Sequence, residues 1–175
     1  LQYAYTKGEK IKKGIYIELG KILRVMHLPK GEGFGRILNG KVEFATFQDW
    51  LQNPDIKKQI EYVKENKLLG EAHGSISSAL EILNTHVGSN TRSSYCHYDF
   101  GSANVFATNQ LTVFDPNPVL NEGYLDLGKS ILIITATDAG LSRSGEQLAQ
   151  GYFDDRIFNK KVLQASILLN AYTKF

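Results

Sequence analysis

Apolar and polar positions follow a helical period along most of this chain. Between residues 15 and 27, apolar side chains recur at positions 15, 19, 22, 23 and 26, which places them on one face of a helix. Asn53-Pro54 is typical of a helix start, since proline fits the first turn. The inner face of that helix is marked by Ile56, Ile60, Val63 and Leu68. Further helices are predicted over 78–87, 124–135, 144–153 and 159–172, and Thr46 could cap a short one holding Phe47, Trp50 and Leu51.

Two hairpins interrupt the helical pattern. Asn39-Gly40 stands between apolar runs at 36–38 and 41–44, which is the strongest short hairpin signal. A second pair of apolar runs, 105–107 and 111–114, is joined by residues 108–110. The pattern therefore predicts a mainly α, α+β fold of helices plus small β-hairpins. Pro29 and Gly31 indicate that the first helix stops there, so we do not interpret the glycines at 31, 33 and 35 as a phosphate loop, which needs a preceding strand.

Composition limits the class of protein. The 175 residues are predicted to form a single domain, residues 1–175. A content of 42% hydrophobic and 22% charged residues is typical of soluble globular proteins. A formal charge of +2 gives no reason to expect nucleic acid as a partner, and no apolar run approaches the ~18 residues of a membrane span. The single cysteine, Cys96, excludes an internal disulfide and suits the cytoplasm.

One motif carries the candidate chemistry. His97-x-Asp99-x-x-x-x-Asn104 is followed by the second hairpin and then by Asp115. A chain of this composition matches the first part by chance about 0.01 times, so the motif is moderately specific. Because a hairpin returns the chain on itself, Asn104 at its start is expected to lie beside Asp115 at its end.

These residue types suit phosphoryl transfer from ATP. That reaction needs a carboxylate for the substrate hydroxyl, here Asp99 as base or orienter, and hard oxygen ligands for Mg²⁺, here Asn104 and Asp115. His97 is interpreted as a brace of the loop by hydrogen bonding rather than as a proton carrier. The sequence therefore predicts a phosphotransferase with Mg²⁺ as cofactor and ATP as donor.

The segment from His97 to Gly128 resembles the catalytic core of the aminoglycoside phosphotransferase family, with its choline kinase and fructosamine kinase relatives, within the protein-kinase-like fold. Tyr124-Leu125-Asp126-Leu127-Gly128 resembles the family's helix start after the metal aspartate, and Leu19 to His27 resembles its leucine-glycine to histidine helix. At the start of the helix predicted over 124–135, Asp126 could cap that helix and also accept hydrogen bonds from the catalytic loop. Family members usually have glycine where this chain has Tyr98, and Pro-Gly where it has Ser102-Ala103.

The resemblance also implies a missing part. A complete kinase of this kind has an N-terminal lobe with a glycine-rich turn and a phosphate-binding lysine, and no such order precedes Leu19. We therefore interpret the chain as the C-terminal catalytic lobe alone, with the N-terminal nucleotide-binding lobe absent. The isolated chain is expected to bind ATP weakly and to be nearly inactive without that lobe.

Other interpretations stay open. The chain could be a metal-dependent hydrolase that uses His97, Asp99 and Asp115, or a catalytically degenerate kinase-like module that binds a partner. The partner of the kinase would be a small-molecule hydroxyl substrate, which the sequence does not identify. A cationic substrate would suit acidic residues after the core, although exposed acids are common, namely Asp138, Glu146, Asp154 and Asp155.

Overall fold

The computed structural model describes residues 14–68, 75–88, 92–107, 111–137 and 143–173. Its α-helices are α1 (Ile15–Met26), α2 (Phe47–Leu51), α3 (Pro54–Glu65), α4 (Ile76–Val87), α5 (Gly123–Thr137), α6 (Ser144–Phe153) and α7 (Lys160–Thr173). Its strands are β1 (Lys30–Glu32), β2 (Phe34–Leu38), β3 (Lys41–Phe44), β4 (Arg92–Cys96), β5 (Val105–Ala107), β6 (Leu111–Val113) and β7 (Val119–Asn121). A 3₁₀ turn, η2 (Ser102–Asn104), precedes β5. No helix in these ranges is long and apolar enough to cross a membrane.

The helices begin within two residues of the positions that the sequence predicts. Asn53 caps α3, because its Oδ1 accepts the Asp55 N–H at 2.9 Å, and Thr46 caps α2 by accepting the Asp49 N–H at 3.1 Å. Ile56, Ile60 and Val63 are buried as expected on the inner face of α3. Leu68 was assigned to the same face and this is wrong: α3 ends at Glu65, and Leu68 lies beyond it with 46% of its surface exposed.

The sheet is larger than the sequence indicated. Five antiparallel strands pair in the order β1-β4-β7-β2-β3, and only the β2–β3 hairpin was predicted. Its turn residues Asn39 and Gly40 have φ of 51° and 76°, as a two-residue hairpin loop requires. Strands β1, β4 and β7 have three to five residues and no clear apolar alternation, so sequence periodicity could not identify them.

The glycines before β2 need a corrected explanation. Strand β1 lies between α1 and Gly33, so the argument that a helix directly precedes the glycines was wrong. Packing and backbone conformation explain them instead. A Cβ on Gly31 would lie 2.7 Å from the Leu120 side chain, and Gly33 turns the chain from β1 into β2 with φ of 84°.

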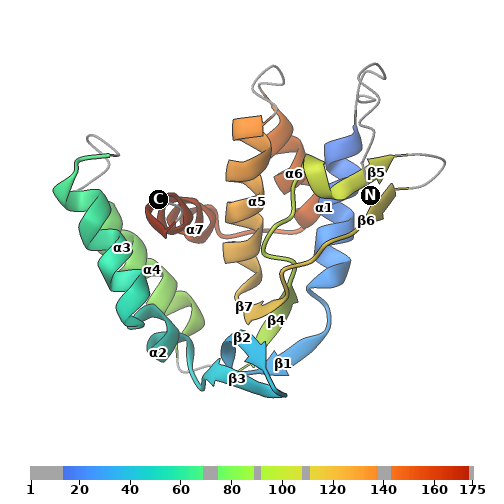
Figure 1. Ribbon diagram of the computed structural model, residues 1–175. Helices are drawn as coiled ribbons and strands as arrows, with labels where there is room; N and C mark the ends of the chain where they lie inside the picture. The colour runs from blue at the N-terminus through green and yellow to red at the C-terminus, as the bar shows by residue number, and fades with distance from the viewer. Residues whose placement is uncertain (1–13, 69–74, 89–91, 108–110, 138–142, 174–175) are drawn as a thin grey trace.

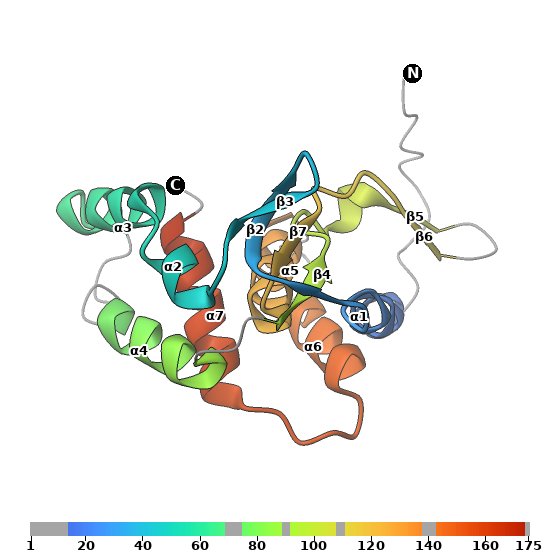
Figure 2. The ribbon, with the colours of Figure 1, turned by 90° about the horizontal axis from the view of Figure 1, so that it is seen from below.

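The second hairpin is confirmed. Strands β5 and β6 pair antiparallel, with Val105 opposite Val113, while the connection at 108–110 lies outside the described residues. Both ribbon views show this hairpin apart from the five-stranded sheet (Figures 1 and 2).

Helix α5 stands between two hydrophobic clusters. Leu125 packs into the cluster of α2, α3, α4 and α7, whereas Leu127 packs into the cluster of α1 and α6. Figure 1 shows α3 and α4 on one flank of α5 and α1 and α6 on the other. Phe100, in the loop after β4, is fully buried in the second cluster. The predicted catalytic loop is therefore packed against the centre of the molecule.

Helices α1 and α6 cross at two glycines. A side chain at Gly20 would collide with the backbone of Leu148, and one at Gly151 would collide with the backbone of Ile17. Because these positions lack side chains, the two helix backbones approach closely. The crossing brings the end of α1, where His27 lies, against Tyr152 of α6.

Candidate active site

The predicted catalytic loop follows an inner strand of the sheet. Strand β4, which pairs with both β1 and β7, ends at Cys96, and residues 97–104 follow. Phe100 is buried, and a Cβ on Gly101 would lie 2.6 Å from Cγ2 of Ile133 in α5. A side chain at position 101 would therefore push the loop away from α5, which explains glycine there.

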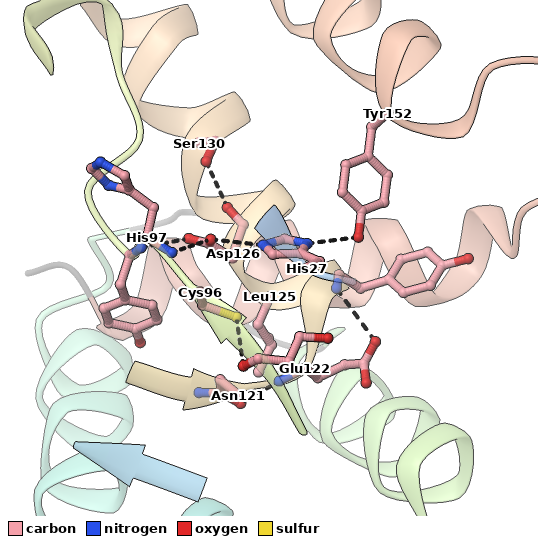
Figure 3. Close-up of polar contacts among 12 residues, drawn as sticks. His27, Cys96, His97, Asn121, Glu122, Leu125, Asp126, Ser130 and Tyr152 are labelled. Carbon is pink, nitrogen blue, oxygen red and sulfur yellow. Dashed lines mark hydrogen bonds and ion pairs between the residues drawn. The ribbon is translucent and has the colours of Figure 1, made fainter. Parts of the chain in front are cut away.

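Asp126 holds the start of the loop. Its side chain is 0% exposed, in the first turn of α5. Its Oδ2 accepts the backbone N–H of His97 at 2.8 Å, and its Oδ1 accepts that of Tyr98 at 2.9 Å (Figure 3). The predicted contact with the catalytic loop is therefore present. The carboxylate is directed to the loop rather than to the N-terminus of α5, so it fixes the backbone immediately before Asp99.

His27 and Tyr152 extend this arrangement, as Figure 3 shows. His27 Nε2 lies 2.9 Å from Asp126 Oδ2, and His27 Nδ1 lies 2.7 Å from the Tyr152 hydroxyl. Burial raises the pKa of Tyr152, so the phenol keeps its proton and can donate it to Nδ1 while Nε2–H donates to Asp126. A Cβ on Gly123 would lie 2.8 Å from the Tyr152 hydroxyl, so glycine is needed for this contact. We call Asp126, His27 and Tyr152 the buried anchor.

Tyr98 adopts a backbone conformation that favours glycine. Its φ is 60°, which a bulky side chain rarely adopts, and this is the position where the resembling family has glycine. Its N–H bond to Asp126 holds that conformation, and Lys129 Nζ lies 3.7 Å from the centre of its ring. Burial, with a smaller effect of the Asp126 charge, raises the pKa of Tyr98 to about 12. The chain therefore has a backbone conformation that favours glycine at a position where its own residue is tyrosine.

His97 uses both ring nitrogens within the protein. Nδ1 accepts the Asp99 N–H at 3.3 Å, and Nε2 lies 3.2 Å from the Phe114 carbonyl, to which it donates. The ring therefore ties the catalytic loop to the residue before Asp115, as the predicted bracing role requires. A hydrolase with His97 as metal ligand would have to break one of these bonds.

Asp99 and Asn104 lie together. Asn104 Nδ2 donates to the Asp99 carboxylate at 3.1 Å and to the Asp99 carbonyl at 2.7 Å. Because the amide nitrogen faces Asp99, the Asn104 Oδ1 is directed away from it. Asp99 itself is exposed. The pair can thus present a carboxylate to a substrate and an amide oxygen to a cation.

Asp115 follows the residue that pairs with Asn104. The Phe114 N–H donates to the Asn104 carbonyl at 3.1 Å, so the two predicted metal ligands leave adjoining backbone positions. Asp115 is exposed and has φ of 54°, which aspartate tolerates better than most residues. An amide oxygen and a carboxylate, both accessible to water, form a donor set that fits Mg²⁺. We call Asp99, Asn104 and Asp115 the reactive face.

A second set of potential metal ligands is buried beside the start of the loop. Among the described residues, His27, Cys96 and Asp126 alone bring three His, Cys, Asp or Glu ligand atoms within 4.8 Å of one another, and His97, Asp99 and Asp115 do not. Burial, then the charge of Asp126, raises the pKa of Cys96 well above its usual value, so its thiol stays protonated and faces the Ser94 carbonyl at 3.5 Å. Since the His27 and Asp126 atoms are also hydrogen-bonded, we interpret this group as support for the loop.

Sequence reasoning identified part of this site. It singled out the loop residues and Asp126, but assigned no role in the site to His27 or Tyr152. The one signal for His27 was its place at the end of the helix that resembles the family's leucine-glycine to histidine segment. Nothing in the sequence around Tyr152 points to a partner 125 residues earlier in the chain.

Comparison with known proteins supports the fold. No family model and no curated protein matches the sequence. A crystal structure titled putative fructosamine-3-kinase, from Thermobifida fusca YX-ER1, is similar with a TM-score of 0.51 and 16% identity. The match covers 93% of this chain and 67% of that one. The chain thus has the α+β fold of a kinase-like C-terminal lobe, and the resemblance predicted from the sequence is confirmed at the level of the fold.

Proposed function

We propose that this chain is the C-terminal catalytic lobe of an ATP- and Mg²⁺-dependent phosphotransferase that phosphorylates a hydroxyl group of a small molecule. One observation carries the proposal. The Asp99 carboxylate is hydrogen-bonded to Asn104 on a loop whose backbone is fixed by the buried carboxylate of Asp126. Burying a charge is unfavourable unless it is well hydrogen-bonded, and Asp126 meets that condition through its bonds to this loop, which supports a fixed backbone beside Asp99.

Each residue of the reactive face would have a separate task. Asp99 would orient the substrate hydroxyl and accept its proton as that oxygen bonds to the γ-phosphorus of ATP and the bond from this phosphorus to ADP breaks. Asn104 and Asp115 would hold Mg²⁺, which when bound neutralises charge on the ATP phosphates. His97 would keep the two segments in register through its bond to Phe114.

We further propose that an N-terminal nucleotide-binding lobe completes the enzyme. Phosphoryl transfer depends on positioning and electrostatic clamping, and much of that clamp belongs to the glycine-rich turn and lysine of such a lobe. The single, buried, protonated thiol agrees with a cytoplasmic location.

Calorimetry and phosphate transfer test these proposals separately. Titration of this chain with Mg·ATP is expected to give an affinity no tighter than about millimolar. Micromolar affinity would contradict the two-lobe arrangement. In the protein that joins the chain to a nucleotide-binding lobe, phosphorus NMR should show transfer of the terminal phosphate of ATP to a hydroxyl compound. Transfer that persists undiminished in Asp99→Asn would contradict the assigned chemistry.

A further inference from the structure

A cavity of about 320 Å³ lies beside the catalytic loop but apart from the reactive face. Tyr98 and Asn117 form part of its wall, whereas no residue of the reactive face is among its described lining residues. Pockets for small molecules occupy roughly 300 to 1,000 Å³, so the cavity is large enough for a compact ligand. Because the reactive residues do not line it, its occupant would not be the group that receives the phosphate. A second cavity of about 420 Å³ lies among α2, α3 and α4.

Two buried carboxamides of the cavity wall are held in opposite senses. Asn121, at the end of β7, is 1% exposed, and its Oδ1 accepts the Glu122 N–H at 2.8 Å, so its NH₂ group is left to donate (Figure 3). Asn170 of α7 is 5% exposed, and its Nδ2 donates both hydrogens, to the carbonyls of Leu125 at 2.9 Å and Ser166 at 2.8 Å. Its Oδ1 is therefore left to accept. Since Glu122 and Leu125 both lie at the start of α5, one donor and one acceptor are fixed to the same segment.

Aromatic rings form another part of the wall. Trp50, Phe44 and Tyr98 line the cavity. Trp50 is held in place because it stacks on Phe47, with ring centroids 5.4 Å apart and an angle of 26° between the rings. Aromatic faces bind apolar or aromatic surface, so the wall suits a ligand with a ring.

The ionic side chains of the wall already have partners within the protein. Glu43 Oε1 accepts from Arg36 Nε at 3.1 Å and from its terminal nitrogen at 2.9 Å, and Glu43 Oε2 accepts the Arg36 N–H at 2.8 Å. Lys129 Nζ lies 3.7 Å from the centre of the Tyr98 ring. The two carboxamides are thus the buried polar groups of the wall with bonding capacity left, which favours a neutral ligand.

The acidic residues considered for a cationic substrate do not belong to this cavity. Asp154, after α6, lies 3.5 Å from Arg24, and neither it nor Glu146 nor Asp155 lines the cavity. Asp138 lies outside the described residues.

Two wall residues connect the cavity to the catalytic loop. The Asn117 N–H donates to the His97 carbonyl at 3.0 Å. Tyr98 belongs to the loop itself, has φ of 60°, and is held by the bond from its N–H to Asp126. A ligand in contact with the Tyr98 side chain would therefore act on the backbone next to Asp99.

We propose that this cavity is a second small-molecule site, which binds a ring compound carrying a neutral carboxamide and transmits its occupation to the catalytic loop. Asn121 donates to the carbonyl of the ligand, Asn170 accepts its N–H, and Trp50 contacts its ring. The polar atoms are already fixed by bonds to the protein, so little order is lost when the ligand binds.

Three matched pyridines test the site: nicotinamide, which carries the carboxamide, 3-acetylpyridine, which lacks its N–H, and nicotinate, which is anionic. In amide NMR titrations of the full chain without ATP, nicotinamide is expected to shift the amide signals of Tyr98, Asn121 and Asn170. It should bind about three- to tenfold tighter than 3-acetylpyridine, which cannot donate to Asn170, and tighter than nicotinate. Equal or tighter binding of either analogue, or no shifts at these amides, would overturn the proposal.

A variant and a matched control locate the binding. Asn121→Leu removes the donor to the ligand carbonyl and should weaken nicotinamide binding at least about threefold. Asn84→Leu makes the same change at an exposed position that lines the other cavity, and should leave the affinity unchanged. An unaltered affinity in Asn121→Leu would contradict the assignment. The comparison of the three pyridines needs no variant, so it decides the proposal even if this substitution disturbs folding.

The link to the loop is measured in the same titration. The amides of His97 and Asp99 should shift with the same saturation curve as that of Tyr98. Shifts confined to β7 and α7 would refute the link. None of these measurements involves ATP or phosphate transfer, so their outcome is independent of the phosphotransferase proposal.

Discussion

The loop from His97 to Asn104 is in contact with two very different environments. The buried anchor of Asp126, His27 and Tyr152 lies in the core, and its polar atoms are joined by hydrogen bonds of 2.7 to 2.9 Å. The reactive face of Asp99, Asn104 and Asp115 is accessible to water. Among the described residues, the side chains of this face are linked to one another only by the hydrogen bonds from Asn104 to Asp99.

This difference separates stability from chemistry. A buried carboxylate whose two oxygens are hydrogen-bonded fixes the backbone that donates to it, and its removal leaves several buried polar groups without partners. An exposed carboxylate contributes little to folding, so it is available for a substrate or a cation. We therefore expect substitutions in the anchor to act mainly on stability and substitutions in the reactive face to act mainly on turnover.

The largest effect is expected from Asp126→Ala. It leaves the N–H groups of His97 and Tyr98 and the ring of His27 without their common acceptor, so the free energy of unfolding should fall by about 3–5 kcal/mol. Asp55→Ala, at an exposed position in the first turn of α3, is the control and should change stability by less than about 1 kcal/mol. Urea denaturation measures both, and equal losses would remove the distinction between the two regions.

The reactive face is tested by a pair of isosteric changes in the protein with its nucleotide-binding lobe. Asp99→Asn should lower turnover by about 10²–10⁴-fold or more with little effect on Mg·ATP binding, because it acts on the hydroxyl in the transition state. Asp115→Asn should weaken Mg·ATP binding and turnover together. Both should leave the free energy of unfolding within about 0.5 kcal/mol of the unaltered chain. A loss of stability as large as that of Asp126→Ala in either variant would show that these residues are structural.

Alkaline pH should weaken the loop at Tyr98. The folded pKa of about 12 lies above the ordinary value of 10.0, so above pH 10 the unfolded chain loses a proton that the folded chain keeps. The contribution is complete below pH 10 and is lost as pH rises toward 12, up to about 3 kcal/mol. Tyr98→Phe should make the decline in stability between pH 10 and 12 shallower. The decline that is left in this variant would be due in part to Tyr152. An unchanged pH profile in Tyr98→Phe would contradict the burial of this phenol.

A smaller effect is expected from Tyr152→Phe. It removes the hydroxyl from His27 Nδ1 and should lower the free energy of unfolding by about 1–3 kcal/mol. Tyr62→Phe is the control, since Tyr62 is 53% exposed and should change stability by less than about 0.5 kcal/mol. If thermal denaturation gave the same midpoint for the two variants, Tyr152 would have no part in the anchor.

The sequence singles out Asp99, Asn104 and Asp115, whereas of the anchor it singles out only Asp126, and the reason is physical. Asp99, Asn104 and Asp115 lie within 17 residues of one another around one hairpin, so local geometry brings them together. His27 lies 99 residues before Asp126 and 125 before Tyr152, and their contact depends on how α1, α5 and α6 pack. The glycines that allow the α1–α6 crossing, Gly20 and Gly151, give no sign in the sequence of which helix each one approaches.

The fold shows the same contrast. Helices with strong apolar periodicity, such as α1 and α3, were predicted within a few residues. Strand β4 reads Arg-Ser-Ser-Tyr-Cys, and its pairing with β1 and β7 rather than its own pattern makes it a strand.

The central claim is that Asn104 and Asp115 hold a divalent cation beside Asp99. Titration with Mn²⁺ in the presence of ATP, observed as paramagnetic broadening of backbone amide signals, tests it most directly on this chain. We expect the strongest broadening at the amides of Asn104 and Asp115, and its loss in Asp115→Asn. Broadening centred on His27, Cys96 and Asp126, or broadening that Asp115→Asn leaves unchanged, would contradict the claim.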